Sequence, residues 1–242
     1  MLMKLKILCL LFFVTVIFSC KKDSIDPPAI KPTEKQQEII SYFLEIAMGS
    51  EFDQLEEVTR KWKKPMTIYV SGSKDTTLLI ELNTVISEIN ELATDNFKVI
   101  LTSDSAHANY QLFLGTGSEY AGRYSSNLKW IEQNFGLFTI STQNHEIIWG
   151  TMYVDIRRAA TLIEQKHLLR EELTQSLGLL RDSYRYANSI FQQSYETKVT
   201  QYSEIDKVLI KLLYHPKITP GLNHSQVIPI LTDILNREFH IN

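Results

Sequence analysis

The segment from Thr161 to Leu180 limits the fold most strongly, because its apolar residues recur at the spacing of an amphipathic helix. On a helical wheel, five leucines form one continuous stripe: Leu162, Leu169, Leu173, Leu177 and Leu180. The opposite face carries His167, Glu171, Gln175 and Gly178. Such a helix has to bury its leucine stripe against another layer of structure. We therefore expect this segment to lie on the core of a globular domain.

The rest of the chain alternates between helical and strand-like patterns. These predict helices at 34–48, 78–92, 203–214 and 224–238, strands at 66–70, 97–101, 110–114, 136–142 and 146–156, and a looser stretch at 115–134. The last two strands are expected to form a hairpin. Strands that first alternate with a helix and then follow one another indicate a mixed sheet with helices packed on it. The expected fold class is α/β (α+β), with a twisted mixed sheet, an edge hairpin, a central motif-bearing helix and a helical C-terminal part.

The N-terminus has the pattern of a secretory signal peptide. A basic start, Met1 to Lys6, precedes an apolar run from Ile7 to Phe18 that ends at Ser19-Cys20. The run is about a dozen residues long, whereas a membrane-spanning helix needs about 20. Residues 1–19 are therefore expected to be a cleaved signal.

Val16-Ile17-Phe18-Ser19, directly before Cys20, resembles the lipobox of bacterial lipoproteins. The resemblance implies that Cys20 becomes the acylated first residue, carrying palmitate-type lipid. It also implies a membrane anchor and a place in the cell envelope outside the cytoplasm, for which we expect the outer membrane. The alternative is an ordinary cleaved signal in which Cys20 is incidental. Because Cys9 lies in the segment to be removed, neither an intrachain disulfide nor a cysteine-based zinc site is expected.

The mature chain is expected to contain a tether and one domain. Residues 20–33 are polar and broken by prolines, which keeps such a segment extended. Residues 34–242 suffice for a single domain, with two small domains as an alternative. A net charge of -3 with scattered basic residues argues against a nucleic-acid partner.

Residues 171–178 carry the candidate chemistry, with the sequence E-E-L-T-Q-S-L-G. Residues four apart stand on the same face of a helix, so Glu171 and Gln175 could share one divalent metal ion. His167, one turn earlier, could join them as a third ligand. In that hypothesis Glu172 is the general base that activates a bound water.

This segment resembles the metzincin pattern H-E-x-x-H-x-x-G with both histidines replaced. Glu172 and Gly178 occupy the positions of the general base and of the glycine that lets the chain turn. The position of the third metzincin histidine is Arg181, which cannot bind a metal because it stays cationic, and Asp182 follows directly. A glutamine amide is a poor zinc ligand, so zinc is disfavoured, whereas calcium, magnesium and manganese tolerate all-oxygen ligands.

Most of the mature chain, about residues 38–222, resembles a bacterial family known only as domain of unknown function number 2927, which is similar to zincin-like peptidases. The resemblance rests on Ser50-Glu51-Phe52, Lys61-Trp62, Ala108-Asn109-Tyr110, the run from Leu112 to Gly115, the run from Arg170 to Leu179 with Asp182, Ser189-Ile190-Phe191, Tyr202 with Asp206, Leu212-Leu213-Tyr214 and Pro220-Gly221. E-E-x-x-Q is that family's own form of the motif. The resemblance implies a zincin-like fold, and it supplies no activity.

Three functions remain open from the sequence. The first is an envelope-anchored, peptidase-like protein with a degenerate metal motif, inactive or non-classical, that binds a peptide or an envelope protein. The second is an active hydrolase with Glu172 as general base and a metal site at Glu171, Gln175 and His167. The third is a structural surface lipoprotein, in which the polar helix face is flat in water or is packed by the loop 182–195.

Aromatic residues outside the helix give two weaker hypotheses. Tyr184, Tyr186 and Tyr195 could line a cleft that Ser189-Ile190-Phe191 plugs. Trp62, Trp130 and Trp149 are expected to be core or half-buried anchors, with a sugar-binding platform as the alternative.

Overall fold

The computed structural model describes residues 31–49, 56–124, 128–194 and 198–238. The predicted signal peptide, Cys20 and most of the predicted tether lie outside these residues. Within them, no helix combines the length and the apolar character needed to cross a membrane.

The described strands form one mixed sheet. They are β1 (Lys61–Trp62), β2 (Met66–Gly72), β3 (Val99–Thr102), β4 (Tyr110–Gly115), β5 (Gly136–Gln143) and β6 (Glu146–Asp155). Their order is β1-β6-β4-β2-β3, and β5 pairs with β6 outside this path. All the pairings are parallel except that of β5 with β6, which is antiparallel. The predicted mixed sheet and hairpin are therefore confirmed.

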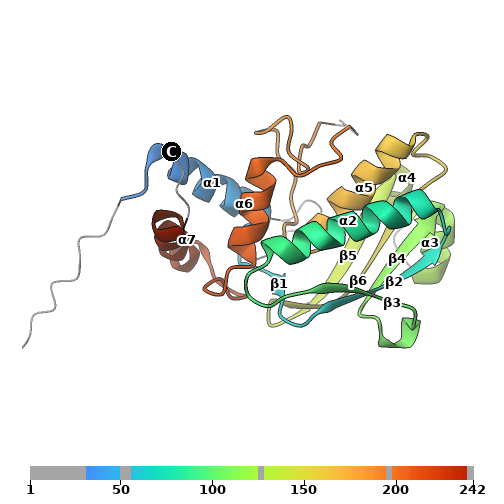
Figure 1. The fold of residues 1–242 in the computed structure, drawn as a ribbon, viewed down its shortest axis with the longest axis horizontal. Coiled ribbons are helices and arrows are strands. Elements are labelled where there is room, and N and C mark those ends of the chain that lie inside the picture. The colour runs from blue at the N-terminus through green and yellow to red at the C-terminus, as the bar shows by residue number, and fades with distance from the viewer. Residues whose placement is uncertain (1–30, 50–55, 125–127, 195–197, 239–242) are drawn as a thin grey trace, which may run out of the picture. The chain divides into compact units, whose positions relative to one another are not determined.

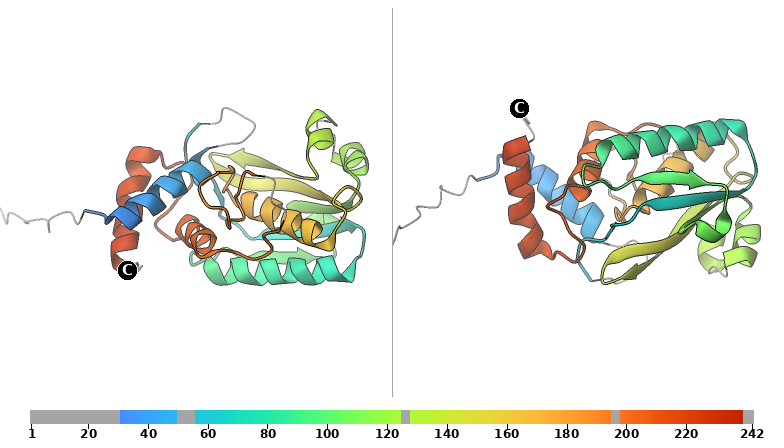
Figure 2. Two further views of the ribbon diagram at one scale, coloured as in Figure 1. Left: turned by 90° about the horizontal axis from the view of Figure 1, so that it is seen from above. Right: turned by 60° about the horizontal axis from the view of Figure 1, so that its bottom comes forward.

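The described helices fall into three groups around the sheet. They are α1 (Glu34–Met48), α2 (Thr76–Leu92), α3 (Gly117–Tyr124), α4 (Leu128–Gln133), α5 (Leu162–Gln175), α6 (Glu204–Leu213) and α7 (His224–Glu238). Helices α2 and α5 lie side by side over one face of the sheet (Figures 1 and 2). Helices α3 and α4 lie together near the ends of β4 and β6, and α1 packs against α6 and α7.

Polar side chains fix the starts of several helices. Thr33, Thr161 and Ser203 each form a reciprocal capping box with the residue three positions later. Helix α1 has the predicted bounds, and the predicted helices at 203–214 and 224–238 agree with α6 and α7 to within one residue. In these segments the apolar period and the capping residues both predict a helix.

The main core lies between the sheet and helices α2 and α5 and continues among α1, α6 and α7. A smaller apolar cluster lies on the other face of the sheet, beneath α3 and α4. It consists of Phe113, Tyr120, Ala121, Ile131 and Tyr153. The two clusters follow from the alternation of side chains along β4 and β6.

The structure corrects three sequence-based expectations. The looser stretch 115–134 contains α3 and α4, whose shortness and glycine content conceal their helical period. The helix predicted to reach Leu180 ends at Gln175, because Gly178 adopts a φ of 114° and the chain turns there. Leu162 is 43% exposed and is not part of the buried leucine stripe. The two-residue strand β1 was not predicted.

Lys61 joins the sheet to the C-terminal helices. Its buried Nζ donates to the carbonyl oxygens of Leu213 at 2.8 Å and Ile218 at 3.0 Å, and lies 2.5 Å from Oδ2 of Asp95. A pocket of about 220 Å³ opens beside this group. An ammonium has three protons to donate, so these contacts already use the Lys61 side chain.

Candidate functional site

Helix α5 carries the motif and is fixed at both ends. The backbone N–H of Glu164 donates to Oγ1 of Thr161 at its start. After Gln175 the chain turns at Gly178, where a β-carbon would lie 2.0 Å from the carbonyl oxygen of Arg60. Only glycine fits this close approach at a positive φ, so the chain turns after α5 at Gly178.

His167 and Glu171 contact each other on the polar face of α5. Nε2 of His167 lies 3.3 Å from Oε2 of Glu171, and Nδ1 lies 2.7 Å from the carbonyl oxygen of Val199. Burial of the ring lowers the pKa of His167, but the hydrogen bond and charge of Glu171 outweigh this and leave the pKa above its usual value. Both ring nitrogens thus face acceptors, which favours the doubly protonated imidazolium.

Gln175 and Asp182 form a second pair on the same face. Nε2 of Gln175 donates to Oδ1 of Asp182 at 2.5 Å. Asp182 therefore does reach the motif face, one residue beyond the position of the third metzincin histidine. The side chain of Arg181 instead lies against Gly49, where a β-carbon would be 2.7 Å from its Cδ.

The four polar residues pair two by two and do not form the ligand set of a zinc site. The His167 ring faces the Val199 carbonyl and Glu171, and the Gln175 amide is hydrogen-bonded to Asp182. Among the described residues, no three His, Cys, Asp or Glu side chains are placed to hold one ion. These side chains do not fit the zinc that a zincin-like fold implies.

The polar face of α5 is not a solvated surface. His167 is 4% exposed and Gln175 is 3% exposed. Asp182 and Val199, both from the segment between α5 and α6, contact these two side chains. The expectation of a flat face in water is therefore wrong. Of the predicted packing loop 182–195, Asp182 contacts Gln175, whereas the contact to His167 comes from Val199, beyond that loop.

Glu172 points elsewhere, toward the start of strand β5. Its side chain is 8% exposed, and a β-carbon on Gly136 would lie 2.7 Å from its Oε1 and 2.9 Å from its Cγ. Glu172 is thus buried between α5 and the edge strand, and not turned toward Glu171 and Gln175. The sequence could not reveal this contact, because Gly136 and Glu172 are far apart along the chain.

Arg170 is a buried cation that the sequence analysis missed. It is 1% exposed, its Nη2 lies 2.9 Å from Oε1 of Glu81, and its Nη1 contacts Glu88. Lys166 also pairs with Glu81, at 3.2 Å. Both cations of α5 therefore pair with glutamates of α2. These ion pairs set the position of α5 on α2.

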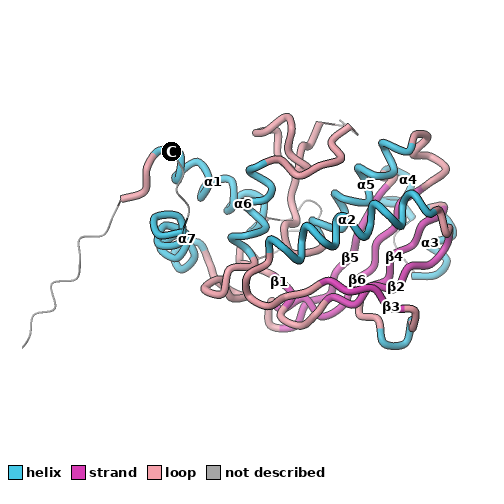
Figure 3. Tube along the Cα trace, viewed as in Figure 1, coloured by secondary structure: helices cyan, strands magenta, loops and turns pink. Residues whose placement is uncertain are grey.

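Side chains of the loop between α5 and α6, which Figure 3 draws in pink, bond to α1 and α6. The Tyr186 hydroxyl donates to Oε1 of Glu38 at 2.5 Å, and Arg185 pairs with Glu45 at 2.9 Å. Ser189 donates to the buried carboxylate of Asp206 at 2.5 Å. Burial raises the pKa of Asp206, despite the hydrogen bonds that Ser189 and Ser203 make to it.

These contacts determine where the residues of the predicted cleft lie. Ser189, Ile190 and Phe191 are fully buried, and Ile190 and Phe191 belong to the main core. Tyr186 is bound to α1 and Tyr184 is 70% exposed, so the two do not line one cleft. Tyr195 lies outside the described residues.

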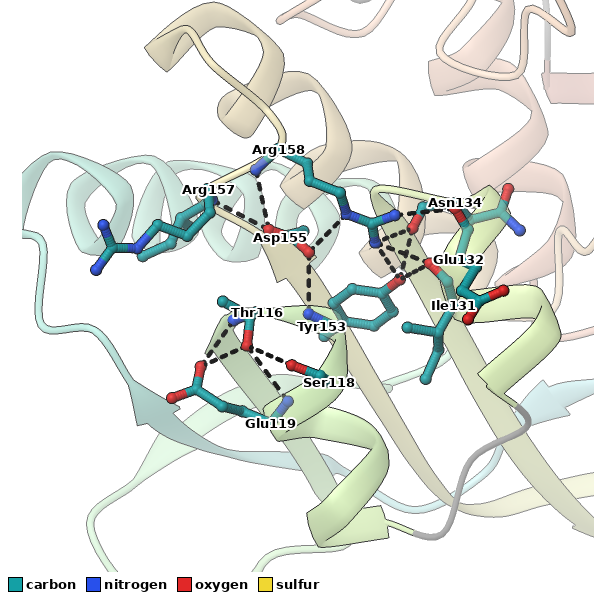
Figure 4. Close-up of polar contacts among 12 residues, drawn as sticks. Thr116, Ser118, Glu119, Ile131, Glu132, Asn134, Tyr153, Asp155, Arg157 and Arg158 are labelled. Carbon is teal, nitrogen blue, oxygen red and sulfur yellow. Dashed lines mark hydrogen bonds and ion pairs between the residues drawn. The ribbon is translucent and has the colours of Figure 1, made fainter.

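A second polar cluster lies where β4 and β6 end (Figure 4). The carboxylate of Asp155 accepts from the backbone N–H groups of Gly117, Arg157 and Arg158, at 2.9, 3.1 and 3.0 Å, and from Nε of Arg158. Arg158 also donates to the carbonyl oxygens of residues 131 and 134. Burial raises the pKa of Asp155, but the hydrogen bonds from Gly117 and Arg158 outweigh this and lower it overall. The cluster ties the end of β6 to α3 and to the C-terminal end of α4.

Comparison with known proteins identifies the chain only at the level of a family. No curated protein matches it. The model of a family described as "Protein of unknown function (DUF2927)" matches residues 36–233. This range includes α5, the loop that packs on it and the edge strand β5. Since the match spans well over half of the 242 residues, the chain belongs to this family of proteins of unknown function.

Proposed function

We propose that the protein is a lipid-anchored, extracytoplasmic, peptidase-like binding protein that holds an extended polypeptide segment along strand β5. The observation that carries this proposal is the burial of Glu172, from the motif helix, against Gly136, the first residue of β5. The strand order, with an antiparallel edge strand and with α5 following β6, supports the zincin-like fold implied by the family resemblance. Helix α5, which carries the motif, and the edge strand β5 thus lie in contact with each other.

The outer edge of β5 offers the backbone groups that such binding needs. Among the described strands, β5 pairs with β6 alone. The Asp155 N–H donates to the carbonyl of Phe135 at 2.7 Å, just before β5. Because antiparallel hydrogen bonding alternates, this bond places the N–H and C=O groups of Phe138 and Ile140 on the side away from β6. An extended peptide can add to such an edge as a further strand.

The proposal does not need the Glu171 and Gln175 face. That face is packed by Asp182 and Val199, which supports a non-catalytic role for it. The active-hydrolase alternative needs the same side chains to release these partners and to converge on an ion. Metal analysis of the protein and of Glu171→Ala and Gln175→Ala tests it, because a stoichiometric ion lost in both variants would establish the alternative.

Binding is tested with a permanently unfolded polypeptide, fluorescently labelled reduced and carboxymethylated lactalbumin, added to the full chain in detergent. Ile140→Pro removes one outward N–H, and Ile140→Ala is the matched control that keeps it. We expect saturable binding by the protein and by Ile140→Ala, and binding roughly tenfold weaker for Ile140→Pro, the effect of about one hydrogen bond. No binding, or equal binding by both variants, would overturn the proposal.

The anchoring part of the proposal has its own test. Cells supplied with radiolabelled palmitate should label the protein, and Cys20→Ala should abolish both the label and the recovery of the protein in membranes. A Cys20→Ala variant that still carries label would place the lipid on another residue.

A further inference from the structure

The sheet face opposite α2 and α5 is covered only at one end by the described residues. Helices α3 and α4 lie over Phe113 and Tyr153 near the ends of β4 and β6. Beyond these, alternate side chains of the strands point away from the main core. We call this surface the open face. It consists of Thr67, Tyr69, Ser71, Ile100, Thr102, Gln111, Thr139, Ser141 and Trp149, all half-buried or exposed.

The residues named for the open face are uncharged, although 22% of the chain's residues are charged, and Glu146 at the far end of β6 is the charged strand residue next to them on this face. Most of its side chains carry a hydroxyl or an amide group. The strand register aligns Thr102, Tyr69, Gln111 and Thr139 in one row across the sheet, through Thr151 of β6. The Tyr120 hydroxyl contacts the Thr151 hydroxyl at 2.5 Å, so this member of the row is buried.

Two aromatic side chains stand on this polar surface. Trp149 is 38% exposed, and Tyr69 is half-buried. Tyr69 is in β2, two strands away from β6, and its row reaches β6 at Thr151. Trp149 lies two residues before Thr151. Strand spacing and rise place their α-carbons about 12 Å apart. A short oligosaccharide can span this distance.

The chemistry of the open face selects among classes of partner. Nucleic acids and anionic lipid surfaces are bound chiefly through Lys and Arg, which the face lacks. The core of a protein–protein interface is apolar and enriched in Arg, Met and aromatic residues, whereas this face is rich in Thr and Ser. Hydroxyl and amide groups both donate and accept hydrogen bonds, and an aromatic ring offers a flat apolar surface. A partner that is itself uncharged, flat and rich in hydroxyl groups matches all of these features.

We propose that the open face is a binding platform for a neutral polysaccharide, with sugar rings stacked on Trp149 and Tyr69 and their hydroxyl groups bonded to the threonine, serine and glutamine side chains. The site is distinct from the polypeptide site, because it uses side chains on the sheet face opposite α5, whereas the polypeptide site uses backbone groups of Phe138 and Ile140 at the edge of β5. Its affinity arises from many uncharged contacts, so high salt should not weaken it.

The test is retention of the full chain, in detergent, on neutral polysaccharides (cellulose, starch, mannan, xylan and mixed-linkage β-glucan) and on acidic ones (polygalacturonate and hyaluronate). The variants are Trp149→Ala, Tyr69→Ala and, as a matched control, Tyr184→Ala, which removes an exposed aromatic side chain from the loop after α5. Thermal unfolding of each variant checks that the fold is kept.

We expect saturable binding to at least one neutral polysaccharide that persists in 1 M NaCl, a condition in which charge contacts are screened. Trp149→Ala and Tyr69→Ala should each weaken it at least tenfold, and Tyr184→Ala should leave it unchanged. The proposal is overturned if no neutral polysaccharide binds, if only acidic ones bind, or if Trp149→Ala binds as well as the unaltered protein. It is also overturned if the protein self-associates through this face, which Trp149→Ala would then abolish.

Discussion

The side chain of Glu172 lies flat against the backbone of Gly136, and the space between them has no room for a methyl group. This contact joins the second glutamate of the motif to the first residue of the free edge strand. Glu172 therefore packs against the edge strand, whereas Glu171 pairs with His167 and Gln175 pairs with Asp182. The contact of Glu172 with Gly136 also explains why a glycine begins β5.

Gly136→Ala should destabilise the protein by displacing Glu172. The added β-carbon would lie 2.7 Å from Oε1, and overpacking of this kind costs about 1–3 kcal/mol. In a Glu172→Ala background the same change should cost less, because the clashing atoms are gone. Urea unfolding of the two single variants and the double variant measures this coupling. Strictly additive effects would show that the two residues do not interact as described.

Gly178→Ala should be severely destabilising, since the residue would have to hold a φ of 114° with its β-carbon 2.0 Å from the Arg60 carbonyl oxygen. The expected loss of unfolding free energy is roughly 3 kcal/mol. Gly122→Ala is the matched control, because nothing lies within 4 Å of a β-carbon there. It should stabilise α3 by about 0.5–1 kcal/mol. Equal thermal shifts for the two variants would contradict this account of the turn after α5.

The contact of His167 with Glu171 should make stability depend on pH. The pKa of His167 in the folded protein is raised above its unfolded value of about 6.5. Its contribution is therefore complete below about pH 6.5 and is lost as the pH rises through the folded pKa. Denaturant unfolding of the protein and of His167→Gln, compared from pH 5.5 to 9, should show a difference that shrinks with increasing pH. A difference that grows with pH would reverse the assigned protonation.

The local patterns of the sequence predicted most of the fold. Helix α1 and the hairpin of β5 and β6 were anticipated because their periodicity, capping and turn residues agree. The short helices α3 and α4 and the two-residue strand β1 were not, since a few residues hold too little periodicity to be distinguished from a loop. The polar face of α5 was recognised, but its burial depends on Asp182 and Val199.

The candidate site was predictable in its residues and not in its pairings. Helical spacing brought His167 next to Glu171, four residues later. The contact of Glu172 with Gly136 and the ion pairs of Arg170 with α2 join distant segments, which only the assembled sheet brings together. Nothing in the local sequence indicated that Arg170, which directly precedes the motif, would be buried.

The most direct test of polypeptide binding at β5 is hydrogen–deuterium exchange of the full chain with and without the unfolded lactalbumin probe. Peptides covering Gly136 to Gln143 should exchange more slowly when the probe is bound, because the outward N–H groups of Phe138 and Ile140 become hydrogen-bonded. The peptide covering the buried strand β4 should be unchanged. Unaltered exchange along β5 while the probe is bound, or protection confined to another surface, would contradict the proposed binding site.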